Sequence, residues 1–209
     1  MEKSAATFAI DPILMPIMRS RTLVLVGMMG AGKSSVGKRL AQALDLPFKD
    51  ADDEIERAAG LSIPDIFALR GEAEFREGER RVIARLLDDP PHVLATGGGA
   101  FVHDETRALV KQKAVSIWLK ADPEVLARRV GRKDNRPLLR GKDPRQVLTE
   151  LLAAREPAYS QADLIIESAD GPHQHTVDAI LAALKSQIEA PPALKAPYER
   201  ERRPKEESQ

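Results

Sequence analysis

The sequence predicts an α/β fold, a three-layer sandwich in which helices cover both faces of a five-stranded parallel sheet. Short apolar or β-branched runs alternate with longer segments whose apolar residues recur at helical spacing. Strands that alternate with helices form parallel βαβ units with right-handed crossovers. At 209 residues, the chain has the length of one domain with a sizeable core.

Each expected element follows from its local pattern. Residues 23–26 read Leu-Val-Leu-Val, a buried strand, and Val36, Leu40 and Leu44 then give the next segment one apolar helical face. Further strands are expected at 93–95, 115–119 and 164–166, with a weaker one at 47–51. Helices are expected near 53–59, 62–88, 104–112, 123–130, 144–155 and 175–188.

The two ends of the chain differ from the rest. Residues 1–20 and the tail at 189–209, where prolines alternate with charges, are expected to be flexible extensions of a folded domain at 21–188. Such composition buries too little apolar surface to offset the entropy of ordering. A docking peptide is the alternative for the tail, although charge runs with proline are more often solvated.

Composition excludes several classes of function. Thirty-two basic residues balance thirty-two acidic ones, so no overall field draws the chain to nucleic acid or to an anionic membrane. Cysteine is absent, which excludes disulfides and thiolate chemistry. Neither a secretory signal nor a window of about 20 apolar residues is found, so a soluble, cytoplasmic protein is expected.

Residues 27–34, GMMGAGKS, match the phosphate-loop pattern G-x-x-x-x-G-K-[ST] between a strand and a helix. The backbone N–H groups of Gly30, Ala31 and Gly32 would surround the β-phosphate at the positive end of the helix dipole. Lys33 would reach the β- and γ-phosphates of ATP, and Ser34 would ligate Mg²⁺. A chance match to a glycine-rich turn is the alternative, but the whole pattern and both flanks agree.

Two further motifs follow other strands. Asp50 and Asp52 end the second strand, where period 2 would place both carboxylates on one face toward the phosphate loop. They repel each other unless a cation or a hydroxyl donor joins them, although Asp52 could instead cap a helix that begins at Asp53. Residues 96–100, TGGGA, would let a ligand approach the backbone closely, and a flexible turn is the alternative.

Arginine side chains can bind a carboxylate or phosphate bidentately and stay charged in a cleft. The candidates are Arg76, Arg128, Arg129, Arg136 and Arg155. Most arginines in any protein are solvated, so residue type alone does not choose among them. Segment 131–144, GRKDNRPLLRGKDP, is a long basic loop bounded by glycine and proline, as expected of a lid that closes over nucleotide and excludes water.

The motifs taken together resemble shikimate kinase. The resemblance rests on GMMGAGKS (27–34), DAD (50–52), GEAEFR (71–76), TGGGA (96–100), RPLL (136–139) and REPAY (155–159), and covers about residues 20–188. It implies a fold related to nucleoside monophosphate kinases. It also implies a usually monomeric enzyme that uses ATP and Mg²⁺ to convert shikimate to shikimate 3-phosphate, a step of chorismate and aromatic amino-acid biosynthesis.

The resemblance also implies a role for each matching residue. Asp50 would help Ser34 to hold Mg²⁺, Asp52 would accept the attacking hydroxyl of shikimate, and Arg76 and Arg155 would bind its carboxylate. Gly97, Gly98 and Gly99 would line the acceptor pocket by backbone. Arg136 would contact both the acceptor and the transferring phosphoryl, and would be catalytic with Lys33 and Asp52. Nucleotide binding would fall to Gly30, Ala31, Gly32, Lys33, Ser34, Ser35, Arg129 and Arg136, with Arg129 against adenine and Ser35 where threonine is common.

Two rival readings remain from the sequence. A gluconate or nucleoside monophosphate kinase would share the phosphate loop and the lid, so Asp52, Arg76, the glycines at 97–99 and Arg155 discriminate. A GTPase or a non-catalytic regulator is the other class. No D-x-x-G occurs, and Asn135 is followed by Arg-Pro-Leu rather than by a guanine-reading K-x-D. Every group that phosphoryl transfer needs is present, which disfavours a regulator.

Overall fold

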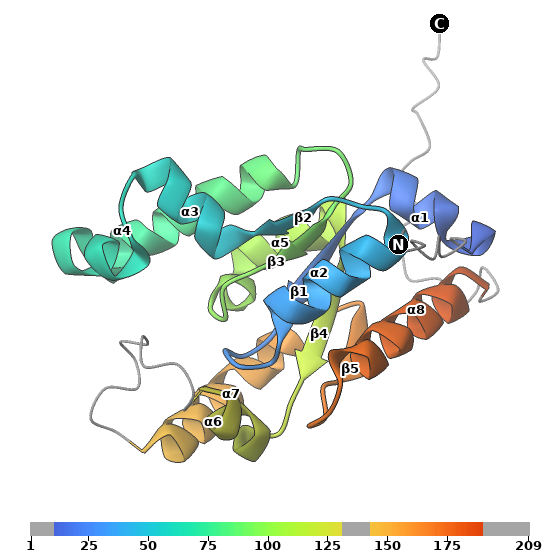
Figure 1. The fold of residues 1–209 in the computed structure, drawn as a ribbon. Helices are drawn as coiled ribbons and strands as arrows, with labels where there is room; N and C mark the ends of the chain where they lie inside the picture. The colour runs from blue at the N-terminus through green and yellow to red at the C-terminus, as the bar shows by residue number, and fades with distance from the viewer. Residues whose placement is uncertain (1–10, 131–142, 190–209) are drawn as a thin grey trace, which may run out of the picture.

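The computed structural model describes residues 11–130 and 143–189, and within them five strands form one parallel sheet (Figure 1). The strands are β1 Thr22–Val26, β2 Phe48–Asp50, β3 Val93–Ala95, β4 Ala114–Lys120 and β5 Leu164–Glu167. Their order is β2-β3-β1-β4-β5, and Val24 in the central strand pairs with Leu94 on one side and Ser116 on the other. The predicted five-stranded parallel sheet is confirmed.

Helices cover both faces of this sheet. They are α1 Met15–Ser20, α2 Lys33–Leu44, α3 Ala51–Ala59, α4 Ile63–Leu86, α5 Asp104–Lys113, α6 Pro123–Val130, α7 Pro144–Tyr159 and α8 His173–Glu189. Helices α2 and α8 pack on one face and α5 on the other, while α3 and α4 form an arm beyond the β2 edge (Figure 1). The three-layer sandwich predicted from the alternation of strands and helices is therefore confirmed.

The core explains why these runs are strands. Every residue of β1 is buried, as are all but the last residue of β4, because helices on both faces remove them from water. The buried rings of Trp118 and Tyr159 lie 5.6 Å apart, which fixes α7 against β4. No helix in the described parts of the chain is long and apolar enough to span a membrane.

The expectation that residues 1–20 are flexible is wrong for residues 11–20. A 3₁₀ turn at Pro12–Leu14 leads into α1, with Asp11 accepting a hydrogen bond from Ile13 N at 3.1 Å as the cap. Leu14 and Met18, four residues apart, bury one apolar side, and proline is compatible with the first turn. Residues 1–10 and 190–209 lie outside the described residues, and Glu189 belongs to α8 rather than to a tail.

Several helices also differ from expectation. Helix α7 continues to Tyr159 rather than ending at 155, and α8 begins at His173 rather than at 175. Helix α3 begins at Ala51 rather than Asp53, because the Asp50 carboxylate accepts a hydrogen bond from Asp52 N at 3.1 Å and caps it. Asp50 and Asp52 are therefore not two residues on one strand face. Helix α4 was expected as one helix but contains Gly71 at φ 81° and ψ 173°, which divides it into two parts with different directions.

Candidate active site

The phosphate loop lies at the carboxyl edge of the sheet, between β1 and α2. Gly30 and Gly32 have φ values of 82° and 93°, in the left-handed region that favours glycine. A Cβ on Gly30 would lie 2.8 Å from Val130 Cγ2, so α6 holds the loop in place. Ser168 Oγ donates to Ala31 O at 3.0 Å, which ties the loop to the segment after β5. The loop is thus a rigid, curled backbone at a helix N-terminus, an anion-binding arrangement.

Lys33 opens α2 and is directed at the loop itself. Its Nζ donates hydrogen bonds to Gly27 O at 2.8 Å and Met28 O at 2.9 Å. The amine is therefore positioned over the curled backbone, where the phosphate-loop pattern places it. Ser35 follows in the first turn of the same helix and is exposed.

Ser34 and Asp50 meet across the gap between α2 and β2. Ser34 Oγ donates to Asp50 Oδ2 at 2.6 Å, so a hydroxyl and a carboxylate oxygen lie side by side next to the phosphate loop. Oxygen ligands of these two types suit Mg²⁺, which keeps several waters and phosphate oxygens of its own. No group of three or more metal-binding side chains occurs among the described residues, and a nucleotide-bound Mg²⁺ does not need one. The pair fits the ion that the sequence implies.

The glycines after β3 form a corner surrounded by charged side chains. A Cβ built on Gly97 would lie 2.7 Å from Glu79 Oε1 and 3.2 Å from Asp52 Oδ1. A Cβ on Gly98 would lie 3.3 Å from Arg155 Nη1, and one on Gly99 only 2.7 Å from Arg76 Nη1. The absence of a side chain here leaves room for the charged groups to approach the backbone this closely. We call residues 97–99 the glycine corner.

The glycine corner also touches the phosphate loop. A Cβ on Gly98 would lie 3.5 Å from both Gly27 O and Met29 N. Arg155 Nη1 donates to Gly98 O at 3.1 Å, and both Arg155 and the Tyr159 hydroxyl contact Met28 Sδ, at 3.9 and 3.8 Å. The structure therefore brings Asp52, Arg76, Arg155 and the glycine corner beside the phosphate loop, at the carboxyl ends of β1, β2 and β3. We call this region the crevice.

Arg76 is held by two carboxylates on its own helix. Its guanidinium donates to Glu79 Oε2 at 2.8 Å and to Glu72 Oε1 at 3.2 Å. Burial disfavours the charged form, but the hydrogen bonds and charges of Glu79 and Glu72 outweigh it and raise the pKa of Arg76. The guanidinium therefore remains a fixed positive charge facing the glycine corner.

The remaining predicted arginines are placed differently. Arg129 donates to Ala169 O at 2.7 Å, to Ser168 Oγ at 3.3 Å and to Gly30 O at 3.4 Å, beside the phosphate loop. Arg128 forms an exposed ion pair with Asp170 at 2.9 Å. Arg136 and nearly all of the expected lid lie outside the described residues, which resume at Asp143, the N-cap of α7.

Three residues near the site were not predicted to act there. Glu79 is 1% exposed, pairs with Arg76 and has its second oxygen, Oε1, without a hydrogen-bond partner among the described residues. The Tyr159 hydroxyl donates a hydrogen bond to Gly98 O, and burial raises the pKa of Tyr159.

His173 begins α8 beside the phosphate loop, and a Cβ on Gly32 would lie 3.2 Å from its Cε1. Burial, then the charges of Arg129 and Arg39, lower the pKa of His173.

Glu79 carries a signal that the sequence does show. It lies on the apolar stripe of α4, four residues after Phe75 and four before Ile83, where a charged side chain needs a buried partner. Tyr159 and His173 carry no such local signal, because their contacts come from distant strands and loops.

Known proteins share both the sequence and the fold. The shikimate kinase of Caulobacter vibrioides is 68% identical over 168 residues, which cover 80% of this chain and 84% of that protein. The shikimate kinase of Bradyrhizobium diazoefficiens is 58% identical over 169 residues, covering 81% and 82%.

Among solved structures, shikimate kinase from Acinetobacter baumannii in complex with shikimate matches with a TM-score of 0.78 and 39% identity, over 82% of this chain and 97% of that one. A gluconokinase from Sinorhizobium meliloti matches at 22% identity and a TM-score of 0.53, over 82% of this chain and 95% of that one, a likeness of fold alone.

Fold and site together define the class of the protein: it is a P-loop kinase. The phosphate loop lies at the switch point of a 2-3-1-4-5 sheet, with the glycine corner beside it. A sequence model of the shikimate kinase family matches residues 29–185, about three quarters of the chain. The chain belongs to the shikimate kinase family.

Proposed function

We propose that the chain transfers the γ-phosphoryl of ATP to the 3-hydroxyl of shikimate, a step of chorismate and aromatic amino-acid biosynthesis. The observation that carries the proposal is the glycine corner, whose backbone meets Asp52, Arg76 and Arg155 while contacting the phosphate loop at Gly27. An acceptor that bears a carboxylate and hydroxyl groups needs cations at one end and a proton acceptor at the other. The corner supplies both within reach of the phosphates.

In the acceptor half, we assign the shikimate carboxylate to Arg76 and Arg155. Glu79 holds Arg76 in place, and the backbone oxygen of Gly98 holds Arg155. Asp52 then accepts the proton of the attacking hydroxyl, since one of its oxygens borders Gly97, the first glycine of the corner. Glycines without side chains let the ring lie against the backbone.

In the nucleotide half, the N–H groups of Gly30, Ala31, Gly32, Lys33, Ser34 and Ser35 surround the phosphates, and Lys33 neutralises charge on the β- and γ-oxygens. Mg²⁺, when bound, would supply further positive charge to these phosphates. Ser34 and Asp50 would hold it, Asp50 through water. Arg129 borders the adenine. Arg136, in the lid, contacts the transferring phosphoryl and the acceptor after closure.

In this proposal the protein acts as a cytoplasmic monomer with no nucleic-acid or membrane partner. The even balance of basic and acidic residues supports the absence of such partners. Light scattering on the purified chain, with and without ATP and shikimate, measures the monomer directly, and a stable dimer in either condition would overturn that part of the proposal.

A coupled assay of ADP release tests the function. Shikimate should support turnover, whereas gluconate and nucleoside monophosphates should not. Arg76→Ala and Arg155→Ala should each reduce kcat/KM for shikimate by about tenfold or more, because a charge-assisted bond to the acceptor is lost, and leave ADP affinity unchanged. Arg128→Ala, which removes an exposed ion pair, is the matched control and should behave like the parent. If either variant loses ADP affinity and keeps its use of shikimate, that arginine has been assigned to the wrong half of the site.

A further inference from the structure

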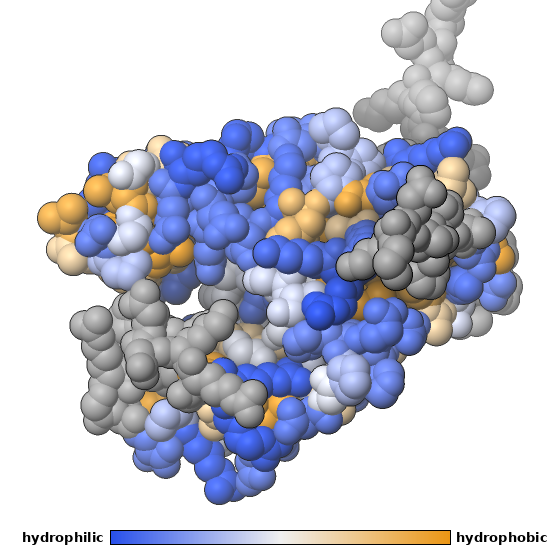
Figure 2. Space-filling model, viewed as in Figure 1, coloured by the Kyte–Doolittle hydropathy of each residue, from blue (hydrophilic) through white to orange (hydrophobic). Residues whose placement is uncertain are grey.

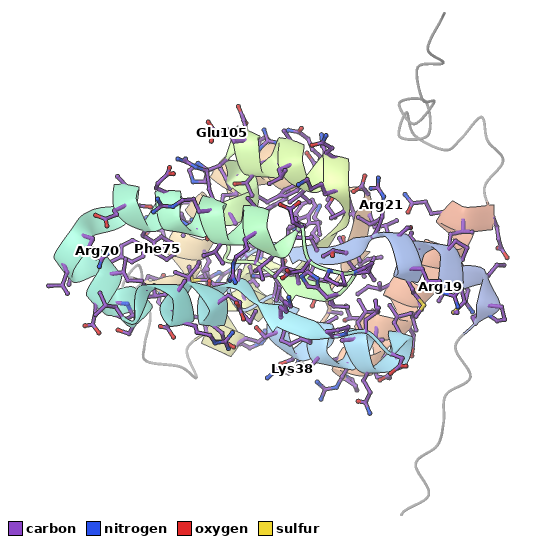
Figure 3. The ribbon with its side chains drawn as sticks, turned by 90° about the horizontal axis from the view of Figure 1, so that it is seen from above. Arg19, Arg21, Lys38, Arg70, Phe75 and Glu105 are labelled. Carbon is purple, nitrogen blue, oxygen red and sulfur yellow. The ribbon has the colours of Figure 1, made fainter. Side chains whose placement is uncertain are left out.

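A second pocket lies outside the crevice, between α3 and α4. It has a volume of about 310 Å³, at the lower end of the range for small-molecule sites. Residues 74, 78, 81 and 85 line it from one face of α4, whereas Arg76 and Glu79 leave the helix on another face toward the glycine corner. The pocket is therefore separate from the site described above. It lies at the end of the molecule where Arg70 and Phe75 are found (Figure 3).

The lining of this pocket combines an apolar floor with a basic rim. Ile55, Ile66, Phe75 and Val82 supply buried apolar side chains, with Ala58 and Ala59 beside them. The charged lining residues are Arg70, Arg81, Arg85 and Glu74, three positive charges and one negative, which leaves a net charge of +2. The space-filling view shows the same mixture, with apolar surface among polar surface at the end formed by α3 and α4 (Figure 2).

The three arginines of the rim differ in their partners. Arg70 pairs with Glu74 at 3.1 Å, and Arg85 pairs with Glu54 at 2.9 Å, both as partly exposed pairs that contribute little to stability. Arg81 is exposed, and no ion-pair partner is found for it in the described ranges. A ligand with one negative group can therefore bind Arg81 without displacing a carboxylate.

Gly78 lines the pocket without a side chain. It lies within α4 at an ordinary helical conformation, and an added Cβ would meet no atom within 4 Å. Alanine is favoured over glycine by about 0.5–1 kcal/mol at such a helix position, so the glycine keeps space open at a site where packing does not require it.

We propose that the pocket between α3 and α4 binds a small aromatic or otherwise apolar carboxylate, with the apolar body on the floor and the carboxylate at Arg81. A bare phosphate would leave the apolar floor uncovered, and a neutral apolar molecule would leave Arg81 without a partner. The floor also contains Phe75, whose ring lies 5.1 Å from the Arg76 guanidinium and 4.6 Å from the Phe67 ring. The occupant therefore borders the acceptor half of the crevice without entering it.

Isothermal titration calorimetry with naphthalene-2-carboxylate tests the proposal, using the whole chain with saturating shikimate and ADP. Binding should persist under these conditions. Shikimate then fills the proposed carboxylate site at Arg76 and Arg155, so the remaining binding reports a separate site. The uncharged naphthalene-2-carboxamide should bind about tenfold more weakly, since a charge-assisted hydrogen bond is lost.

Two variants locate the bound probe. Gly78→Leu should abolish binding by filling the pocket, and Arg81→Gln should weaken it about tenfold. Arg80→Gln, on the same helix but outside the pocket, is the matched control and should bind like the parent. Each variant should keep parental turnover, and Arg81→Gln and Arg80→Gln should also keep the parental melting temperature. Because Arg81 is exposed, its variant remains informative if Gly78→Leu does not fold. Displacement of the probe by shikimate, or unchanged binding in Arg81→Gln, would overturn the proposal.

Discussion

At the scale of single residues, the site depends on how closely charged groups approach a backbone without side chains. Gly99 shows this most directly, because it has an ordinary φ of −97° and does not need to be glycine for conformational reasons. The reason is the Arg76 guanidinium, which occupies the space that a Cβ would need. The triple glycine is thus explained by its neighbours rather than by its flexibility.

Gly99→Ala should therefore damage acceptor use alone. Its Cβ would lie 2.7 Å from Arg76 Nη1 and 2.9 Å from Cζ, and Arg76 cannot withdraw without breaking its pairs with Glu79 and Glu72. We expect kcat/KM for shikimate to fall by about tenfold or more, while the Kd for ADP stays at the parental value. Parental kinetics would mean that Arg76 does not bind the acceptor.

Lys33→Met should affect the nucleotide half. The amine lies over the curled backbone of the phosphate loop, so its removal takes a positive charge from the β- and γ-phosphates. We expect kcat to fall by about 10²–10³ with the fold intact by circular dichroism. A folded variant with near-parental turnover would remove this loop from the chemistry.

Sequence reasoning reached most of these residues because the motifs are local. The phosphate loop, the glycine corner, Arg76 and Arg155 each lie in a short recognisable segment, and the structure brings them together. Tyr159 was missed because its partners are distant in sequence, whereas Glu79 was missed although its place on the apolar stripe of α4 marked it. A pattern along the chain does not say which carboxylate meets Gly97.

At the scale of elements, the strands were easier to predict than the helix boundaries. The strands β1, β3 and β4 are nearly continuous apolar runs buried on both faces, and all five strands were placed within one residue. The start of α3 depended on whether Asp50 ended a strand or capped a helix, and it does both. The division of α4 at Gly71 left no trace in the apolar pattern, since the helical spacing continues on both sides of it.

Gly71→Ala tests the importance of that division. At φ 81° and ψ 173° the backbone adopts a conformation that is essentially restricted to glycine, and a Cβ would meet no neighbour, so any loss of stability comes from the backbone alone. We expect the free energy of unfolding to fall by about 1–3 kcal/mol in urea titrations. The acceptor KM should also rise, because the second part of α4 carries Arg76.

Gly78→Ala is the matched control for this experiment. It lies in the same helix with ordinary dihedral angles and open space at Cβ, and should stabilise the protein by about 0.5–1 kcal/mol. Equal effects of the two substitutions would show that Gly71 is an ordinary helical glycine.

At the scale of the whole molecule, a buried histidine links stability to pH. His92 is fully buried at the amino end of β3, its Nδ1 donates to Pro90 O at 2.9 Å, and its Nε2 has no hydrogen-bond partner within the described ranges. Burial lowers the pKa of His92, opposed in part by the bond to Pro90. Below the unfolded value of about 6.5, the unfolded chain therefore binds more protons than the folded one.

Acidification should thus destabilise the protein, and His92→Gln should lessen the effect. We expect the free energy of unfolding of the parent to fall between about pH 7.5 and 5.5, and to fall less in the variant. Urea titrations of the parent and the variant at these two pH values measure the free energy of unfolding. His175→Gln, at an exposed position in α8, should retain the parental difference, and an unchanged pH dependence in the His92 variant would exclude His92 as its source.

The helix before β1 has a consequence for how the protein can be handled. Asp11 pairs with Lys185 at 2.6 Å, so the first described residue lies beside the last turns of α8. Helix α8 begins at the phosphate loop and runs to the amino edge of the sheet, away from the crevice (Figure 1). A short linker could therefore join residues 11 and 189, and new ends could be opened in a surface turn such as that at Gly60. A circularly permuted kinase built in this way should keep its activity.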